Sequence, residues 1–173
     1  MKTFDQLIYD LTYRSYSWTP VAIPQSVRKL PYFKPSKVKV ALFPFEYYDL
    51  TGNFGVYTPT KDTIRLLPSH HYSSQTYFEC ALYHETVHWT GHPSRLARRP
   101  LLDTYRSLVD EAHEELIANM ATYLELEDQY SLCSIVRYSG QPEFSLNYLK
   151  NIYYNEVQQA RAFIDAQHKE PYI

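Results

Sequence analysis

The chain has 173 residues, and 19 Asp and Glu side chains nearly balance its 17 Lys and Arg, so indiscriminate binding to nucleic acid is disfavoured. The length favours a single hydrophobic core, and no stretch approaches the roughly 18 uncharged apolar residues that a membrane span needs. Two cysteines are too few for a disulfide framework, and Asp5 and Asp10 interrupt the apolar start of the chain, unlike a signal peptide, so a cytoplasmic protein with reduced thiols is expected.

The N-terminal third combines one expected helix with extended chain. Apolar side chains at helical spacing predict an opening helix over residues 3–16. Four prolines over residues 19–35 predict an extended strap, because proline interrupts helices. β-Branched and aromatic side chains then predict a strand over residues 37–48 and a hairpin over residues 55–67.

The rest of the chain has the residue spacing of helices. Candidate helices cover residues 74–90, 104–126 and 144–167, and Gly91 and Gly140 are typical stop signals. Strands followed by helices indicate the α+β class. The first of these helices also carries the residues that point to a chemical function.

That helix contains the pattern His-Glu-x-x-His at residues 84–88. Histidines at positions i and i+4 lie on one helix face, so His84 and His88 can bind one Zn²⁺ with bonds of about 2.0–2.1 Å. Glu85 follows the first ligand directly, which keeps it off the metal but close enough to take a proton from the attacking water. The pattern predicts a catalytic zinc site with Glu85 as general base; the alternative is a helix whose histidines serve packing or surface roles.

A catalytic zinc needs a third protein ligand, and an acidic segment downstream offers candidates. Glu115 is the first choice, because it lies deeper in its helix and among apolar neighbours. Glu114 is the alternative. Asn119 and Glu111 share the face of Glu115, so Asn119 can support a ligand by hydrogen bonding, and Glu111 can support a ligand or contact the substrate. Acidic side chains near a helix start can also act on the helix dipole alone.

Basic side chains follow the His-Glu-x-x-His helix. Gly91 allows the chain to reverse, and His92 and Arg95 lie just beyond it. A cation there can hold a substrate carboxylate or stabilise an oxyanion, and the simpler interpretation is a helix cap with an ion pair. Arg98 and its neighbours are expected in a solvated charged loop. Eighteen tyrosines are too many for the sequence to select an oxyanion donor.

Longer runs around these residues match a known family. The run Tyr83-His-Glu-Thr-Val-His-Trp-Thr-Gly-His-Pro-Ser-Arg-Leu and the later run Glu114-Glu-Leu-Ile-Ala closely resemble the zincin-like metallopeptidase domain of the plasmid antirestriction ArdC family. The resemblance extends over roughly residues 55–168. The run from Trp89 to Leu96 makes it far more specific than the zinc motif alone.

This resemblance implies the fold and the site residues of that family. It implies metal ligands at His84 and His88, Glu85 as the base, and the second Glu of the pair, Glu115, as the third ligand. The implied fold is a zincin-like α+β domain, in which a small twisted sheet with an edge hairpin packs on the metal-binding helix and further helices.

The resemblance also implies an activity, which is zinc-dependent hydrolysis of a peptide bond, with Mn²⁺ as the alternative cofactor. The expected partner is a protein or peptide substrate from the host, without a membrane. The resemblance also implies that the chain is encoded by a plasmid or phage and acts in anti-restriction or anti-defence. Residues 1–54 are expected to pack, as helix, strap and strand, on the same domain as the metallopeptidase core at 55–173.

Two departures from the family pattern change these expectations. Family members commonly carry a separate N-terminal domain for single-stranded DNA, and the roughly 55 residues before the matching region are too few for it, so DNA binding is not carried over. The family tends to have an acid where this chain has Asn119, and a neutral amide polarises a ligand less, which predicts weaker metal affinity. The alternative function is a non-catalytic, metal-containing protein that binds a host protein or single-stranded DNA through its tyrosine-rich N-terminal region.

Overall fold

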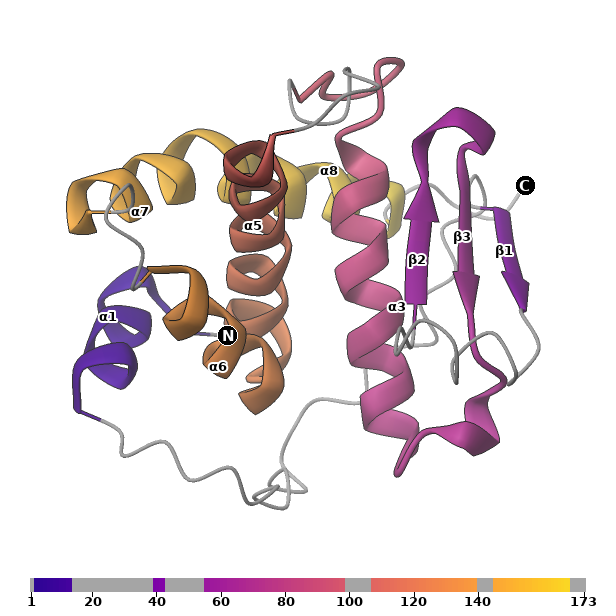
Figure 1. The fold of residues 1–173 in the computed structure, drawn as a ribbon, viewed down its shortest axis with the longest axis horizontal. Coiled ribbons are helices and arrows are strands. Elements are labelled where there is room, and N and C mark those ends of the chain that lie inside the picture. Colours follow the sequence, from indigo (N-terminus) through magenta and orange to yellow (C-terminus); the bar gives the residue numbers. More distant parts are fainter. Residues whose placement is uncertain (1, 14–38, 43–54, 99–106, 140–144, 169–173) are drawn as a thin grey trace.

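The computed structural model in Figure 1 describes five stretches of the chain, residues 2–13, 39–42, 55–98, 107–139 and 145–168. A small sheet lies at one side of the molecule, and most of the helices lie at the other side. Helix α3 (Gln75–Thr90) stands between the sheet and the remaining helices (Figure 1). The α+β class predicted from the sequence is confirmed.

Three short strands form the sheet: β1 (Lys39–Leu42), β2 (Gly55–Thr58) and β3 (Thr63–Leu66). Their order is β1, β3, β2, with β1 parallel and β2 antiparallel to β3. Within the described residues β2 is therefore an edge strand, and it is the strand beside α3 (Figure 1). The predicted hairpin is confirmed, and β1 lies within the strand predicted over residues 37–48, whose remaining residues are outside the described stretches.

Packing between the hairpin and α3 holds the sheet against the helix. Side chains alternate along β3, so that Ile64 and Leu66 are fully buried. They form an apolar cluster with Tyr57 of β2 and with two side chains of α3, Leu82 and Trp89. This cluster fixes β2 beside the helix that carries the His-Glu-x-x-His pattern.

Two well-capped helices form the centre of the molecule. The side chain of Ser74 accepts a hydrogen bond at the start of α3, which begins at Gln75 as predicted. Helix α5 (Leu108–Leu126) begins at a capping box, in which Ser107 and Asp110 each accept a hydrogen bond from the other's backbone N–H. The capping box explains why α5 begins after residue 104, where the spacing pattern alone predicts its start.

The remaining helices are α1 (Phe4–Tyr13), α6 (Gln129–Ser139), α7 (Leu146–Ile152) and α8 (Gln158–His168), and a π-helical stretch, Tyr153–Val157, joins α7 to α8. The sequence did not predict α6. Glu127 ends α5 in the left-handed conformation, with a φ of 56°, and Asp128 then accepts a hydrogen bond from the Ser131 N–H at 2.9 Å in the first turn of α6. The break contains neither glycine nor proline, so no stop signal marks it.

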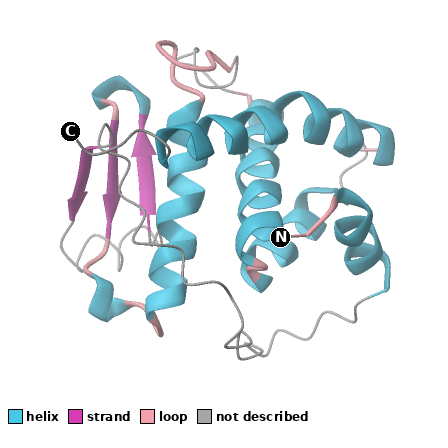
Figure 2. Ribbon diagram, turned by 180° about the vertical axis from the view of Figure 1, so that it is seen from behind, coloured by secondary structure: helices cyan, strands magenta, loops and turns pink. Residues whose placement is uncertain are grey.

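The main core lies between α5 and the helices around it. Leu116 of α5 is fully buried, and Phe4 and Leu7 of α1 belong to the same apolar cluster. In Figure 2, which shows the molecule from behind, α8 crosses α3 near the C-terminal end of α3, where Phe163 packs against Trp89. No helix in the described stretches is both long and apolar enough to cross a membrane.

Candidate metal centre

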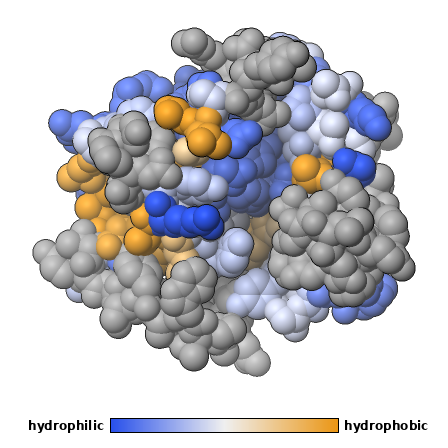
Figure 3. Space-filling view, in the orientation of Figure 1, coloured by the Kyte–Doolittle hydropathy of each residue, from blue (hydrophilic) through white to orange (hydrophobic). Residues whose placement is uncertain are grey.

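Two helices meet at the predicted metal site. His84 and His88 stand one turn apart on α3, with their Nε2 atoms 3.1 Å from each other. Glu115, from α5, places one carboxylate oxygen 3.4 Å from His84 Nε2 and the other 3.3 Å from His88 Nε2. Figure 3 shows hydrophilic side chains gathered on the surface over the region between α3 and α5. Three potential metal donors from two helices therefore converge.

The distances between these donors fit a metal ion. In a tetrahedral site with bonds of about 2.05 Å, neighbouring donors lie about 3.3 Å apart. The two histidine Nε2 atoms are 3.1 Å apart, and each lies 3.3–3.4 Å from a different oxygen of Glu115. With one ligand atom taken from each residue, the three donors lie within 4.8 Å of one another. Such close nitrogen and oxygen lone pairs repel one another unless a proton or a cation lies between them. The three side chains thus suit a divalent cation with three protein ligands, which leaves one tetrahedral position open.

Charge also favours a cation at this point. Burial by itself would lower the pKa of His88, but the carboxylates of Glu115 and Glu114 outweigh burial and raise it to about 10. Burial would raise the pKa of Glu115, but the two histidines hold it well below its usual range. The acidic groups therefore stabilise positive charge between the donors, and a bound metal ion would supply that charge in place of a proton.

Glu85 lies beneath strand β2 and is 8% exposed. Its carboxylate accepts a hydrogen bond from the backbone N–H of Tyr57. A Cβ atom added to Gly55 would lie 3.0 Å from Glu85 Cγ and 3.3 Å from Glu85 Oε1, so the strand passes directly against this side chain. Burial raises the pKa of Glu85, and the charges of His84 and His88 oppose that rise. The sequence contained no signal for this contact, since it depends on how the hairpin packs on α3.

Glu114 lies on the opposite side of the His88 ring from His84 and Glu115. Its Oε1 atom is 3.1 Å from His88 Nδ1, whereas the donors meet at Nε2. Arg98 binds both oxygens of Glu114, with Nε donating to Oε2 at 2.9 Å and Nη2 donating to Oε1 at 2.5 Å. The expectation that Arg98 lies in a solvated loop is wrong, because its side chain is buried. Of the two adjacent glutamates, the structure brings Glu115 to the donor cluster and Glu114 to the back of His88.

Comparison with known proteins identifies the fold that carries this site. The family model MPTase-PolyVal, described as zincin-like metallopeptidase, matches residues 47–139, which is just over half of the chain. The chain belongs to this zincin-like metallopeptidase family. The zincin-like metallopeptidase domain predicted from the sequence is therefore confirmed.

Two solved structures of the antirestriction protein ArdC from the R388 plasmid are similar to this zincin-like chain. The Mn(II)-bound structure is 22% identical with a TM-score of 0.48, and the match covers 78% of this chain and 48% of that one. The metal-free structure is 21% identical with a TM-score of 0.48, covering 78% and 47%. The chain thus spans about half the length of the ArdC structures it matches. No curated protein was found to match it.

Asn119 and Glu111 occupy different surroundings in this zincin-like domain. The side-chain amide of Asn119 donates to the backbone carbonyl of Glu115 at 2.8 Å and lies 3.5 Å from Glu115 Oε2. Asn119 is therefore placed to steady the Glu115 carboxylate rather than a histidine. Glu111, one turn before Glu115, is exposed.

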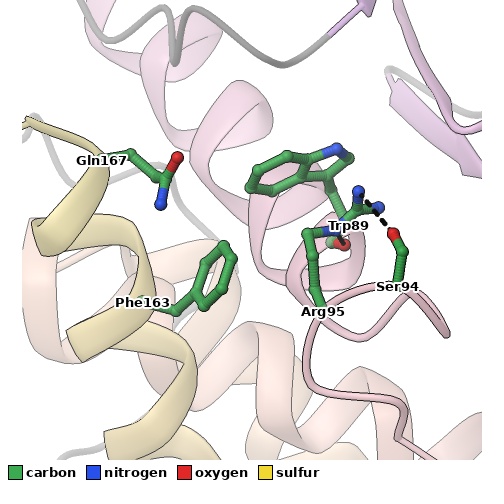
Figure 4. Close-up of a pocket in the computed structure, with 5 residues that line it drawn as sticks. All are labelled: Trp89, Ser94, Arg95, Phe163 and Gln167. Atoms are coloured by element: carbon green, nitrogen blue, oxygen red, sulfur yellow. Dashed lines mark hydrogen bonds between the residues drawn. The ribbon is translucent and has the colours of Figure 1, made fainter. Parts of the chain in front are cut away.

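Arg95 is engaged with the hairpin. Its guanidinium binds Asp62 with Nη2 at 2.5 Å from Oδ1, contacts the Tyr57 hydroxyl at 3.2 Å, and lies over the Trp89 ring. Figure 4 shows Arg95 at a cavity of about 290 Å³, lined also by Ser94, Phe163, Trp89 and Gln167. Because its donors are bound to protein groups, Arg95 acts in this structure as a link between the end of α3 and the hairpin.

The chain reversal after α3 does not use the special freedom of glycine. Gly91 has a φ of −80°, which any residue can adopt, and the left-handed position falls instead at Ala97, with a φ of 48°. His92 lies in this turn, with its Nδ1 atom 2.8 Å from the hydroxyl of Ser94. The turn carries the chain back so that Arg98 reaches Glu114.

Two tyrosines in the described stretches have pKa values that the acidic residues of the site help to raise. The pKa of Tyr138 is raised first by burial and then by the negative charge of Glu115. The pKa of Tyr72 is raised by burial and, more weakly, by the charge of Glu85. Both hydroxyls are thus within electrostatic range of the site acids. The sequence could not select either, because Tyr72 and Tyr138 lie far from the His-Glu-x-x-His pattern along the chain.

Proposed function

We propose that this chain is a zinc-dependent metallopeptidase, in which His84, His88 and Glu115 hold the metal and Glu85 is the general base. The observation that carries the proposal is the convergence of the three side chains, with the two Nε2 atoms 3.1 Å apart and a Glu115 oxygen within 3.4 Å of each, close to the donor spacing of a tetrahedral metal. A bound divalent metal would supply Lewis-acid chemistry, which polarises a peptide carbonyl and makes water more acidic.

Glu85 would move the proton in this reaction. Its carboxylate takes a proton from the attacking water and delivers it to the nitrogen of the leaving amine. The buried position supports this role, because burial raises the pKa of Glu85 towards the range in which one group can both accept and release a proton. The Tyr57 N–H holds the carboxylate in place, and Gly55 leaves room for it.

The edge of β2 would hold the peptide. Because the Tyr57 N–H points to Glu85, the carbonyls of Gly55 and Tyr57 lie on the same open edge, away from β3. An extended peptide can donate its N–H groups to those carbonyls and so extend the sheet by one strand. This arrangement would place a peptide bond beside Glu85 and the donor cluster.

The motif resemblance to ArdC supports the wider role. The run from Trp89 to Leu96 and the Glu114-Glu-Leu-Ile-Ala run are the residues on which that likeness rests. We propose a cytoplasmic enzyme of a plasmid or phage, with a host protein as substrate in anti-restriction or anti-defence. One ArdC structure is described as Mn(II)-bound, and Mn²⁺ is the alternative to Zn²⁺ in our proposal.

Two measurements test the proposed function. Purified protein should contain one metal equivalent by atomic emission, and His84→Ala should lose it; stoichiometric metal in that variant would refute the ligand assignment. Glu85→Gln should retain the metal and lose cleavage of a casein-like substrate or of the chain itself. Unchanged cleavage by Glu85→Gln would remove Glu85 as the base. A wild type that binds the metal but cleaves neither substrate would favour a non-catalytic binding protein.

A further inference from the structure

A buried ion pair lies behind the candidate metal site. Glu114 is 2% exposed and Arg98 is 5% exposed, and the two side chains make two hydrogen bonds with each other. Burying two charges is expensive, and such a pair contributes little net stability compared with apolar side chains of similar volume. The position of the pair therefore calls for an explanation other than stability.

Capping of α3 accounts for only part of this arrangement. Arg98 Nη2 donates to the carbonyl of Val87 at 2.7 Å, and Nη1 donates to the hydroxyl of Thr90 at 2.7 Å, both in the last turn of α3. A cap would need no carboxylate from another helix. Nevertheless, both oxygens of Glu114 accept hydrogen bonds from Arg98, which orients the carboxylate at two points.

The carboxylate held in this way faces one particular atom of His88. Glu114 Oε1 lies 3.1 Å from Nδ1, and an ionised carboxylate can only accept a hydrogen bond, so Nδ1 must carry the proton. In the neutral imidazole, the lone pair is then on Nε2, which is the atom that faces His84 and Glu115. The contact therefore selects the tautomer that can bind a metal.

Charge balance fits the same role. Arg98 neutralises Glu114, so the pair offers a strong acceptor to His88 without adding net negative charge to the site. His84 differs from His88, since no described residue forms a hydrogen bond or an ion pair with its Nδ1 atom. Within the described part of the chain, one of the two histidines is thus held from behind by a fixed carboxylate, whereas the other is not.

We propose that Glu114 and Arg98 are positioning residues for the metal site: Glu114 fixes the ring orientation and tautomer of His88, and Arg98 acts through Glu114 by fixing its carboxylate. This inference rests on the proposed metal site and adds two residues to it. Partners that orient a metal-bound histidine typically contribute 10- to 100-fold to metal affinity. The pair should therefore act on metal binding as well as on folding.

The test compares two charge-neutralising variants on α5. Glu114→Gln removes the negative charge and replaces one of the two acceptor oxygens with an NH₂ group, which would point a donor at the guanidinium or at His88. Glu125→Gln is the matched control, since Glu125 lies on the same helix, pairs with the buried Arg161 of α8 at 2.9 Å and is not a partner of His88. Both variants should lose stability in urea unfolding. Only Glu114→Gln should bind Zn²⁺ about 10- to 100-fold more weakly in competition with a chromophoric chelator.

Two further measurements complete the test. Arg98→Met should weaken Zn²⁺ binding in the wild-type background and add little to Glu114→Gln, because Arg98 acts through Glu114. If Glu114→Gln does not fold, ¹⁵N NMR of the zinc-loaded wild type decides the question, since Nδ1 of His88 should carry the proton and Nε2 should not. A folded Glu114→Gln with Zn²⁺ affinity within threefold of wild type, or a proton on Nε2, would overturn this inference. A wild type that binds no Zn²⁺ would instead contradict the proposed function.

Discussion

Replacing Gly55 with alanine tests the contact between the sheet and the carboxylate of Glu85, the proposed general base. The new Cβ atom would lie 2.8 Å from Leu66 Cδ2 and 3.0 Å from Glu85 Cγ, and the first distance is shorter than real Cβ contacts allow. Leu66 is fully buried, so it cannot move aside freely. Overpacking of this kind costs about 1–3 kcal/mol. The backbone of Gly55 is not left-handed, so alanine also restricts the unfolded chain and returns about 0.4–1 kcal/mol.

The net expectation for Gly55→Ala is a loss of about 1–2 kcal/mol in the free energy of unfolding, measured by urea denaturation. The variant should also retain its metal and cleave substrate at least tenfold more slowly, because small displacements of a catalytic group are costly. Val56→Ala is the control: Val56 is half-buried beside the Leu67 and Tyr72 cluster, so its truncation destabilises the hairpin without adding atoms against Glu85.

A double variant separates the two contacts of the new methyl group. Leu66→Val removes the Cδ2 atom, so the stability loss of Gly55→Ala with Leu66→Val should be smaller than the sum of the single losses by about 0.5 kcal/mol or more. The rate of cleavage should not recover, because the contact with Glu85 remains. Additive stability losses, or a single variant that is as stable and as active as wild type, would refute the reasoning about Gly55.

Three further outcomes are expected. Removing the metal with a chelator should lower the thermal midpoint, since free Zn²⁺ at a hundred times its dissociation constant adds about 2.7 kcal/mol; an unchanged midpoint would contradict a native metal site. Ser107→Ala should cost about 1 kcal/mol in urea unfolding without altering metal binding, because it removes the N-cap of α5. Burial by itself would raise the pKa of Asp62, but hydrogen bonds from Arg95 and Tyr57 lower it below 3.8. The Asp62 contribution is therefore complete well above pH 3.8 and is lost as the pH falls below that value through the lowered pKa of the folded state. Asp62→Asn should cost on the order of 0.5 kcal/mol at pH 7, since solvent screens the partly exposed pair, and progressively less as the pH falls below 3.8.

Local sequence signals predicted the elements that depend on neighbouring residues. The hairpin and α3 follow from residue spacing and from the β-branched side chains, and the structure contains both. Helix α6 was missed because the chain breaks at Glu127 in a left-handed conformation that favours glycine, and the tertiary packing of α6 on α5 stabilises the break. The sequence predicted that Gly91 lets the chain reverse after α3. The chain does reverse there, but Gly91 does not adopt the positive φ that only glycine tolerates easily.

The sequence by itself determined which side chains of α3 can act together. His84 and His88 are four positions apart, and the helical repeat puts them on one face whatever surrounds the helix. The tertiary structure alone decided between the adjacent Glu114 and Glu115, which point in different directions from α5. Only the packing of α5 against α3 decides which of these carboxylates meets Nε2 and which meets Nδ1 of His88.

The same distinction holds for Arg98 and Gly55. The charged segment that contains Arg98 was predicted to be a solvated loop, because nothing in the local sequence indicates a buried partner. The turn after α3 nevertheless brings Arg98 to the carboxylate of Glu114, sixteen residues later in the chain. Gly55 lies in a strand of ordinary composition, and only the approach of β2 to Glu85 leaves no room there for a side chain. Spacing within one helix thus determined the candidate chemistry of this protein, and contacts between elements decided how its site is held, because they depend on distances that no local pattern encodes.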